Sequence, residues 1–131
     1  MTEKSIVKAV VQSLKEDGFR VSTEVSNFYR SADIGAVDHK GKLWVIECKV
    51  SNIGRAIEQS KTHKLSADKV FIATLQRKTK EVTLRKIREA GVGLFYVMSD
   101  GSVSEPIEEP GLNEPWGLAR EKLLSRIMEG R

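Results

Sequence analysis

Cysteine is nearly absent from this chain of 131 residues, and Cys48 is its single example. One cysteine excludes an internal disulfide framework and a CxxC-type metal site. The two histidines, His39 and His63, have no cysteine or histidine at ligand spacing, which excludes a zinc site, and both are expected at the surface. No apolar stretch approaches the roughly 20 residues that cross a bilayer, and the N-terminus lacks a signal-peptide pattern. We therefore expect a cytoplasmic protein without a membrane partner.

The overall composition is that of a globular protein, but its charge is unevenly distributed. Hydrophobic residues make up 40% and charged residues 31% of the chain, and the net charge is +4. Nine Lys or Arg residues stand against two acids between Lys61 and Arg88, whereas the segment from Glu105 to Glu114 holds four acids and no base. Such asymmetry orients a protein on a polyanion, and we favour nucleic acid over the alternative of an ordinary solvated helix surface.

Hydrophobic periodicity predicts alternating helices and strands. The length fits a single domain over residues 1–131. Thr2 is a plausible helix N-cap, and Ser51 or Asn52 can cap the second helix, whose Leu65 is expected to face inward. Antiparallel hairpins followed by right-handed crossovers predict a mixed sheet. The expected helices are Thr2 to Gly18, the segment after Asn52, 79–90 and 116–129, and the expected strands are 19–25, 32–37, 43–50, 70–75 and 93–98.

Three ionisable residues interrupt the second and third expected strands. Asp33 opens one apolar run, and Glu47 and Lys49 lie in the next, beyond the turn 38–42. Neighbouring strands lie about 5 Å apart, so an acid on each can meet at one end of the sheet. Glu47 and Lys49 are two apart and leave the same face of the strand, whereas Cys48 between them is expected in the core on the opposite face. Two carboxylates beside a lysine suit a divalent cation and an anionic substrate.

The segments "SADIGAV" and "LWVIECKV", with thirteen residues between Asp33 and Glu47, resemble the PD-(D/E)xK nuclease superfamily. Ala32 stands where many members carry proline. The resemblance covers roughly Thr2 to Thr74 and implies a restriction-endonuclease-like α/β fold, with an αβββαβ core and a mixed central sheet flanked by helices. An extra αβ unit and a C-terminal helix would complete a single nuclease-like domain, with its core at about 2–98 and an extension at about 100–131.

The resemblance also implies a mechanism. Asp33, Glu47 and the main-chain carbonyl of Cys48 would hold Mg²⁺ or Mn²⁺, and Lys49 would position the attacking water or stabilise the developing oxyanion. Gln59 resembles the glutamine that some members place beside the active site. An alternative for the triad is a structural salt bridge between Lys49 and Glu47 or Asp33.

Further residues are weaker candidates for the same site. Glu3 and Glu24 are possible accessory acids, although an acid in a first helical turn is also what the helix dipole prefers. Phe28, Tyr29 and Trp116 are candidates for base stacking, although aromatic residues beside apolar strands are more often core. Candidate nucleic-acid contacts are Arg30, Arg55, Lys61, Lys64, Arg77 and Lys78.

The leading hypothesis is a metal-dependent DNA endonuclease or exonuclease acting in repair, recombination or phage defence. The alternative is a catalytically silent module that keeps the fold for nucleic-acid binding or assembly. An RNase would use the same mechanism on a different polymer. A homodimer formed through the final helix is a further hypothesis.

Overall fold

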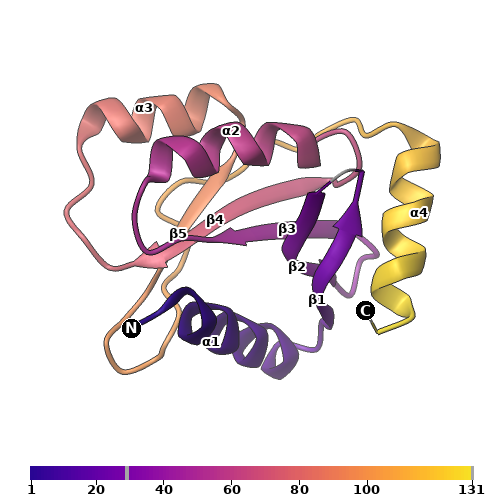
Figure 1. Cartoon of the computed structure of the whole chain (residues 1–131), viewed down its shortest axis with the longest axis horizontal. Helices are drawn as coiled ribbons and strands as arrows, with labels where there is room; N and C mark the ends of the chain where they lie inside the picture. Colours follow the sequence, from indigo (N-terminus) through magenta and orange to yellow (C-terminus); the bar gives the residue numbers. More distant parts are fainter. Residues whose placement is uncertain (29, 131) are drawn as a thin grey trace.

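A five-stranded mixed sheet between helices organises the chain (Figure 1). The computed structural model describes residues 1–28 and 30–130. The elements are α1 (Glu3–Glu16), β1 (Arg20–Asn27), β2 (Arg30–Val37), β3 (Leu43–Cys48), α2 (Ile53–His63), β4 (Lys69–Leu75), α3 (Glu81–Glu89), β5 (Gly93–Val97) and α4 (Gly117–Met128). Among the described residues, no helix has the length and apolar character to cross a bilayer.

The strands follow one another across the sheet in chain order. The first three form an antiparallel meander, and β3, β4 and β5 are parallel, joined by α2 and α3. The predicted fold class, an α/β protein with a mixed sheet flanked by helices, is therefore confirmed. The third strand ends at Cys48 and not at Val50, but the amide of Lys49 still donates to the carbonyl of Ala73 on β4 at 3.0 Å. Lys49 thus stays beside the C-terminal end of β4.

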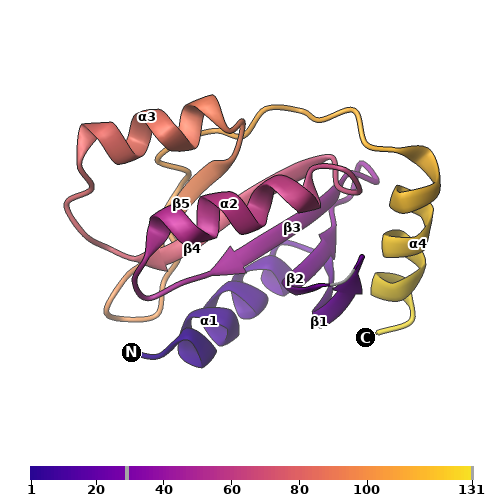
Figure 2. The same ribbon diagram turned by 45° about the horizontal axis from the view of Figure 1, so that its top comes forward.

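Helices lie on both faces of the sheet (Figure 2), and each face has a hydrophobic core. On one face α1 packs its buried residues Ile6 and Val10 against Ile46 and Phe71. On the other face α2, α3 and α4 supply the second core. This second layer includes α2, which lies over the end of the sheet where the predicted acids stand, so α2 is well placed to contribute side chains to them.

Local signals set the register of the hairpin that carries the acids. Asp38 accepts hydrogen bonds from the amides of Lys40 and Lys42, both at 2.9 Å, and Gly41 adopts a φ of +81°. This turn, as predicted, joins β2 to β3. The predicted N-cap is also confirmed, because Thr2 and Ser5 form a reciprocal capping box at the start of α1.

Two predictions about the second helix were wrong in detail. Leu65 was expected to face inward but is 54% exposed, because α2 ends at His63 and the chain turns before Leu65. Asn52 occupies the N-cap position, yet it adopts a left-handed conformation with φ 58° and makes no side-chain capping bond. Its main-chain carbonyl instead accepts from the amides of Arg55 and Ala56.

The last helix is part of the packed structure, and Gly35 is the point of closest approach. A Cβ at Gly35 would lie 2.7 Å from the side chain of Ile127 on α4. We expect Gly35→Ala to lower the free energy of unfolding by about 1–3 kcal/mol, because α4 must shift to admit the methyl group. Gly117→Ala is the matched control, since nothing lies within 4 Å of its Cβ position. Urea unfolding of both variants checks this, and equal stabilities would contradict the packing of α4 on β2.

Candidate functional site

The predicted acids lie where strands β2 and β3 separate. The last paired residues are Ile34 and Ile46, and one further step along each strand places Asp33 opposite Glu47. Beyond this point β2 continues beside β1, and β3 continues beside β4. The two carboxylates therefore stand at the fork between two halves of the sheet.

Beyond the last β2–β3 pair, the Asp33 carboxylate replaces a main-chain carbonyl of β2 as the hydrogen-bond acceptor for β3. Its Oδ2 accepts a hydrogen bond of 2.8 Å from the amide of Cys48. In an extended strand the N–H and C=O of one residue point to the same side, so the Cys48 carbonyl also faces the gap beside Asp33. The Cys48 side chain is buried against α1 on the other face, as predicted, and burial raises the pKa of its thiol. The structure thus brings together Asp33, Glu47 and the Cys48 main chain.

Electrostatic repulsion between the two acids is the main chemical property of this fork, together with burial. Removal from water raises the pKa of Asp33 from 3.8 to about 7, and the negative charge of Glu47 is the next largest cause. The amide of Cys48 acts in the opposite direction, and the ammonium group of Lys49 lowers the pKa of Asp33 least of all. Near neutral pH Asp33 is therefore about half protonated, and its proton can be shared with Glu47 in a site with little cationic compensation.

Glu47 is fixed by a buried chain of hydrogen bonds that the sequence did not reveal. Glu47 is 5% exposed, and its Oε1 lies 2.5 Å from Nε2 of His63 on α2. Nδ1 of the same ring lies 2.8 Å from Nδ2 of Asn27 on β1. Because an amide nitrogen can only donate, Nδ1 accepts, the ring proton sits on Nε2, and His63 donates to Glu47.

The prediction that His63 is a surface residue was wrong, because its side chain is 0% exposed. Neighbouring lysines in the sequence suggested a solvated position. The helical spacing would have predicted burial, because His63 falls on the same face of α2 as the buried residues Ala56, Ile57 and Ser60. Only the fold, which lays α2 across the fork, shows that this face carries a donor to Glu47.

Lys49 lies near the acids without pairing to them. It follows the last residue of β3 and is partly exposed. Within residues 1–28 and 30–130, no salt bridge joins it to Asp33 or Glu47, so the predicted alternative of a structural ion pair is not what the side chain forms. Arg77 donates to the carbonyl of Val50 and, at 2.8 Å, to the hydroxyl of Thr74, which fixes the segment just after Lys49.

The two accessory acids lie beside Asp33. Glu3 from α1, Glu24 from β1 and Asp33 line one depression of about 210 Å³, which gives solvent access to Asp33 on the α1 side. Glu24 has a φ of +49°, a left-handed conformation that breaks the alternation of β1 at this point. Gln59 is half-buried on α2, and no polar contact joins it to the acids in the described part of the chain.

The predicted basic residues are dispersed. Lys61 pairs with Glu58 at 2.9 Å, and Lys64 donates to the carbonyl of Ala90 at 2.6 Å, so both are engaged within the helical layer. Arg55 and Lys78 are exposed, and Arg30 is half-buried at the start of β2. Of the aromatic candidates, Phe28 and Trp116 are exposed, and Tyr29 lies outside the described residues.

The donor set available to a cation is small. Among the residues that the structure describes, no three His, Cys, Asp or Glu side chains gather as a metal cluster would. The fork offers two carboxylates and one main-chain carbonyl, which are hard oxygen donors of the kind that Mg²⁺ and Mn²⁺ prefer.

No protein-family model matches this chain, and no curated protein matches it. Among the solved structures similar in fold are the following two. The SPO1766 protein of unknown function from Silicibacter pomeroyi aligns with a TM-score of 0.76 and 20% identity over 98% of this chain and 85% of that one. A chain of the EndoMS–dsDNA2 complex aligns with a TM-score of 0.53 and 15% identity over 75% of this chain. The alignment covers 46% of that chain, and it shows a similarity of fold.

Proposed function

We propose that the protein is a metal-dependent nuclease of the PD-(D/E)xK type that hydrolyses phosphodiester bonds in DNA. The observation that carries this proposal is the placement of Asp33 opposite Glu47 at the fork of the sheet, with the main chain of Cys48 between them. The fold similarity to a nuclease solved with DNA supports the same function.

The residues at the fork fit a divalent cation. One oxygen of Asp33 accepts from Cys48 and one oxygen of Glu47 accepts from His63, so each carboxylate is oriented, and a cation would replace the hydrogen bond that joins the two acids. Burial and, next, the negative charge of Glu47 raise the pKa of Asp33, and a bound cation would offset both effects. Asp33, Glu47 and the Cys48 carbonyl would hold the ion. When bound, the ion supplies an activated water and neutralises charge on the phosphate.

The remaining steps depend on side chains of this chain. Lys49 is partly exposed next to the fork, where its ammonium group can donate to a phosphate oxygen or to the attacking water. His63 holds Glu47 in one orientation from the buried side. The depression lined by Glu3 and Glu24 gives the scissile phosphate access to Asp33.

Lys49→Ala is expected to lower metal-dependent cleavage by about a hundredfold or more, because one donor to the developing charge is lost. Stability should change little, since Lys49 forms no salt bridge in the described part of the chain. The test incubates the protein with supercoiled, linear, single-stranded and branched DNA, and with RNA, in Mg²⁺, Mn²⁺ or EDTA. Lys40→Ala, which removes an exposed charge from the β2–β3 turn, is the matched control.

Cleavage that requires a metal and is lost in Lys49→Ala but kept in Lys40→Ala supports the nuclease. DNA binding with no cleavage in any metal overturns it in favour of a catalytically silent binding module. Cleavage of RNA alone would keep the mechanism and change the substrate.

A further inference from the structure

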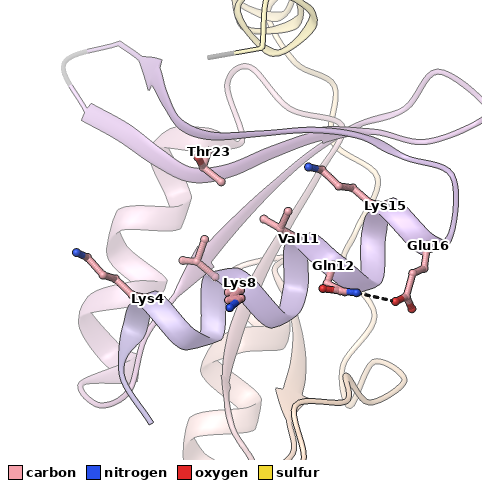
Figure 3. Close-up of a pocket in the computed structure, with 8 residues that line it drawn as sticks. Lys4, Lys8, Val11, Gln12, Lys15, Glu16 and Thr23 are labelled. Carbon is pink, nitrogen blue, oxygen red and sulfur yellow. Dashed lines mark hydrogen bonds between the residues drawn. The ribbon is translucent and has the colours of Figure 1, made fainter.

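A second depression runs along α1 on the same side of the sheet as the Asp33 opening. It lies between α1 and β1 and has a volume of about 570 Å³. Figure 3 shows its lining, with the helix below and Thr23 of β1 above. Three lysines contribute to it, Lys4, Lys8 and Lys15, and we refer to it as the α1 groove.

The three lysines form one stripe on the helix. At 3.6 residues per turn, positions 4, 8 and 15 fall within an arc of about 40°. All three side chains are exposed, and no salt bridge occupies them in the part of the chain that the structure describes. The one acid of the groove, Glu16, lies at its far end, where its carboxylate accepts from Gln12 at 3.1 Å. The stripe therefore presents a continuous positive edge.

The α1 groove leads to Asp33 at the fork. It shares Lys4, Val7 and Thr23 with the depression that Asp33 lines. A chain of phosphates lying along the lysines would thus reach the Asp33 carboxylate without crossing a helix. The change from lysines to carboxylates along one path is the charge pattern expected of a track for a polyanion that ends at a cation site.

We propose that the α1 groove binds the phosphate backbone of one nucleic-acid strand and directs it to Asp33 and Glu47. The proposal rests on the proposed nuclease function and adds a binding surface to it. Counts of charge along the sequence did not reveal this surface, because the bases of α1 are balanced locally by Glu3, Glu16 and Asp17. Helical spacing places the three lysines on one side of α1, which a count of charges along the segment does not show.

The test is a binding titration with a fluorescently labelled single-stranded oligonucleotide in EDTA, where binding can be measured without metal-dependent cleavage. The variant Lys4→Gln, Lys8→Gln, Lys15→Gln removes three charges with a residue that favours helix. The control variant Lys40→Gln, Lys86→Gln, Lys122→Gln removes three exposed charges elsewhere. Both have the same net charge, and circular dichroism checks that both keep the fold.

At low salt the groove variant should bind the oligonucleotide at least about tenfold more weakly than the control variant. The magnitude of the slope of log affinity against log salt concentration should be smaller in the groove variant by about 2, because three phosphate contacts are lost. Equal affinities and slopes for the two variants would overturn the proposal that the α1 groove binds the phosphate backbone, even if the wild-type protein cleaves DNA in Mn²⁺. If the groove variant binds more weakly and the wild-type protein does not cleave DNA, the proposal for the α1 groove is supported and the proposed nuclease function is overturned.

Discussion

Asp33→Asn should abolish metal-dependent cleavage while making the metal-free protein more stable at alkaline pH. Loss of a ligand that holds the cation should cost about a thousandfold or more in rate. Asparagine keeps an oxygen that can accept from the Cys48 amide, and its amide group can donate to Glu47 at any pH, whereas Asp33 can do so only when it is protonated. In EDTA at about pH 8 we expect a gain of about 2 kcal/mol in the free energy of unfolding, a value discounted for the partial exposure of Asp33.

The raised pKa of Asp33 determines at which pH values Asp33→Asn is more stable than the wild-type protein. The pKa of Asp33 is raised from 3.8 to about 7 in the folded protein, so the folded state binds the proton more tightly than the unfolded state. The stability that comes from protonated Asp33 is fully present below pH 3.8 and is lost as pH rises through about 7. Wild type and Asp33→Asn should therefore be equally stable near pH 3.8 and diverge above it. Parallel stability curves in EDTA across this range would contradict the repulsion at the fork.

The same ionisation should govern binding of the metal. Below about pH 7 a cation must displace the proton from Asp33, so Mn²⁺ affinity should fall about tenfold per pH unit and level off above neutrality. Calorimetric titration of Mn²⁺ at several pH values measures this slope. Glu3→Gln is a useful comparison, because it removes one charge from the same depression and leaves the proposed ligands in place.

The fold could be predicted from the sequence because each element carries its own local signal. The apolar run of β4 indicated a strand buried on both faces, and the Asp38 turn fixed the hairpin that precedes it. The meeting of Asp33 and Glu47 was expected from the hairpin alone, since neighbouring strands lie close together, and the structure adds the register that places the two acids opposite each other. The strand ends were less predictable, because Lys49 continues the hydrogen bonding to β4 after the regular strand has ended.

The surroundings of the acids could not be predicted in this way. Asn27, Glu47 and His63 come from β1, β3 and α2, and only tertiary packing brings them into one hydrogen-bonded chain. The role of the basic segment 61–88 could not be predicted either. Lys64, for example, donates to the carbonyl of Ala90 and is therefore not available to bind a nucleic acid. The sequence of a segment gives the number of its charged side chains, but binding depends on which face of the helix or strand those side chains occupy.

His63→Ala tests whether the buried partner of Glu47 holds the site in place. The substitution leaves the Glu47 carboxylate buried without its donor and removes a fully buried ring, so we expect the free energy of unfolding to fall by about 3–5 kcal/mol. His39→Ala is the matched control, because His39 is exposed in the β2–β3 turn. Chemical denaturation of the two variants at one pH checks the difference.

A double-mutant cycle separates the Glu47 contact from the loss of ring volume. In a Glu47→Ala background no buried charge remains to lose its donor, so His63→Ala should cost less there by about 1–3 kcal/mol. His63→Gln, whose amide can also donate, should recover part of the stability and part of the cleavage. A His63→Ala cost that is the same in both backgrounds would show that the imidazole fills space without orienting Glu47. Cleavage retained in His63→Ala would show that Glu47 needs no buried donor to hold its position beside Asp33.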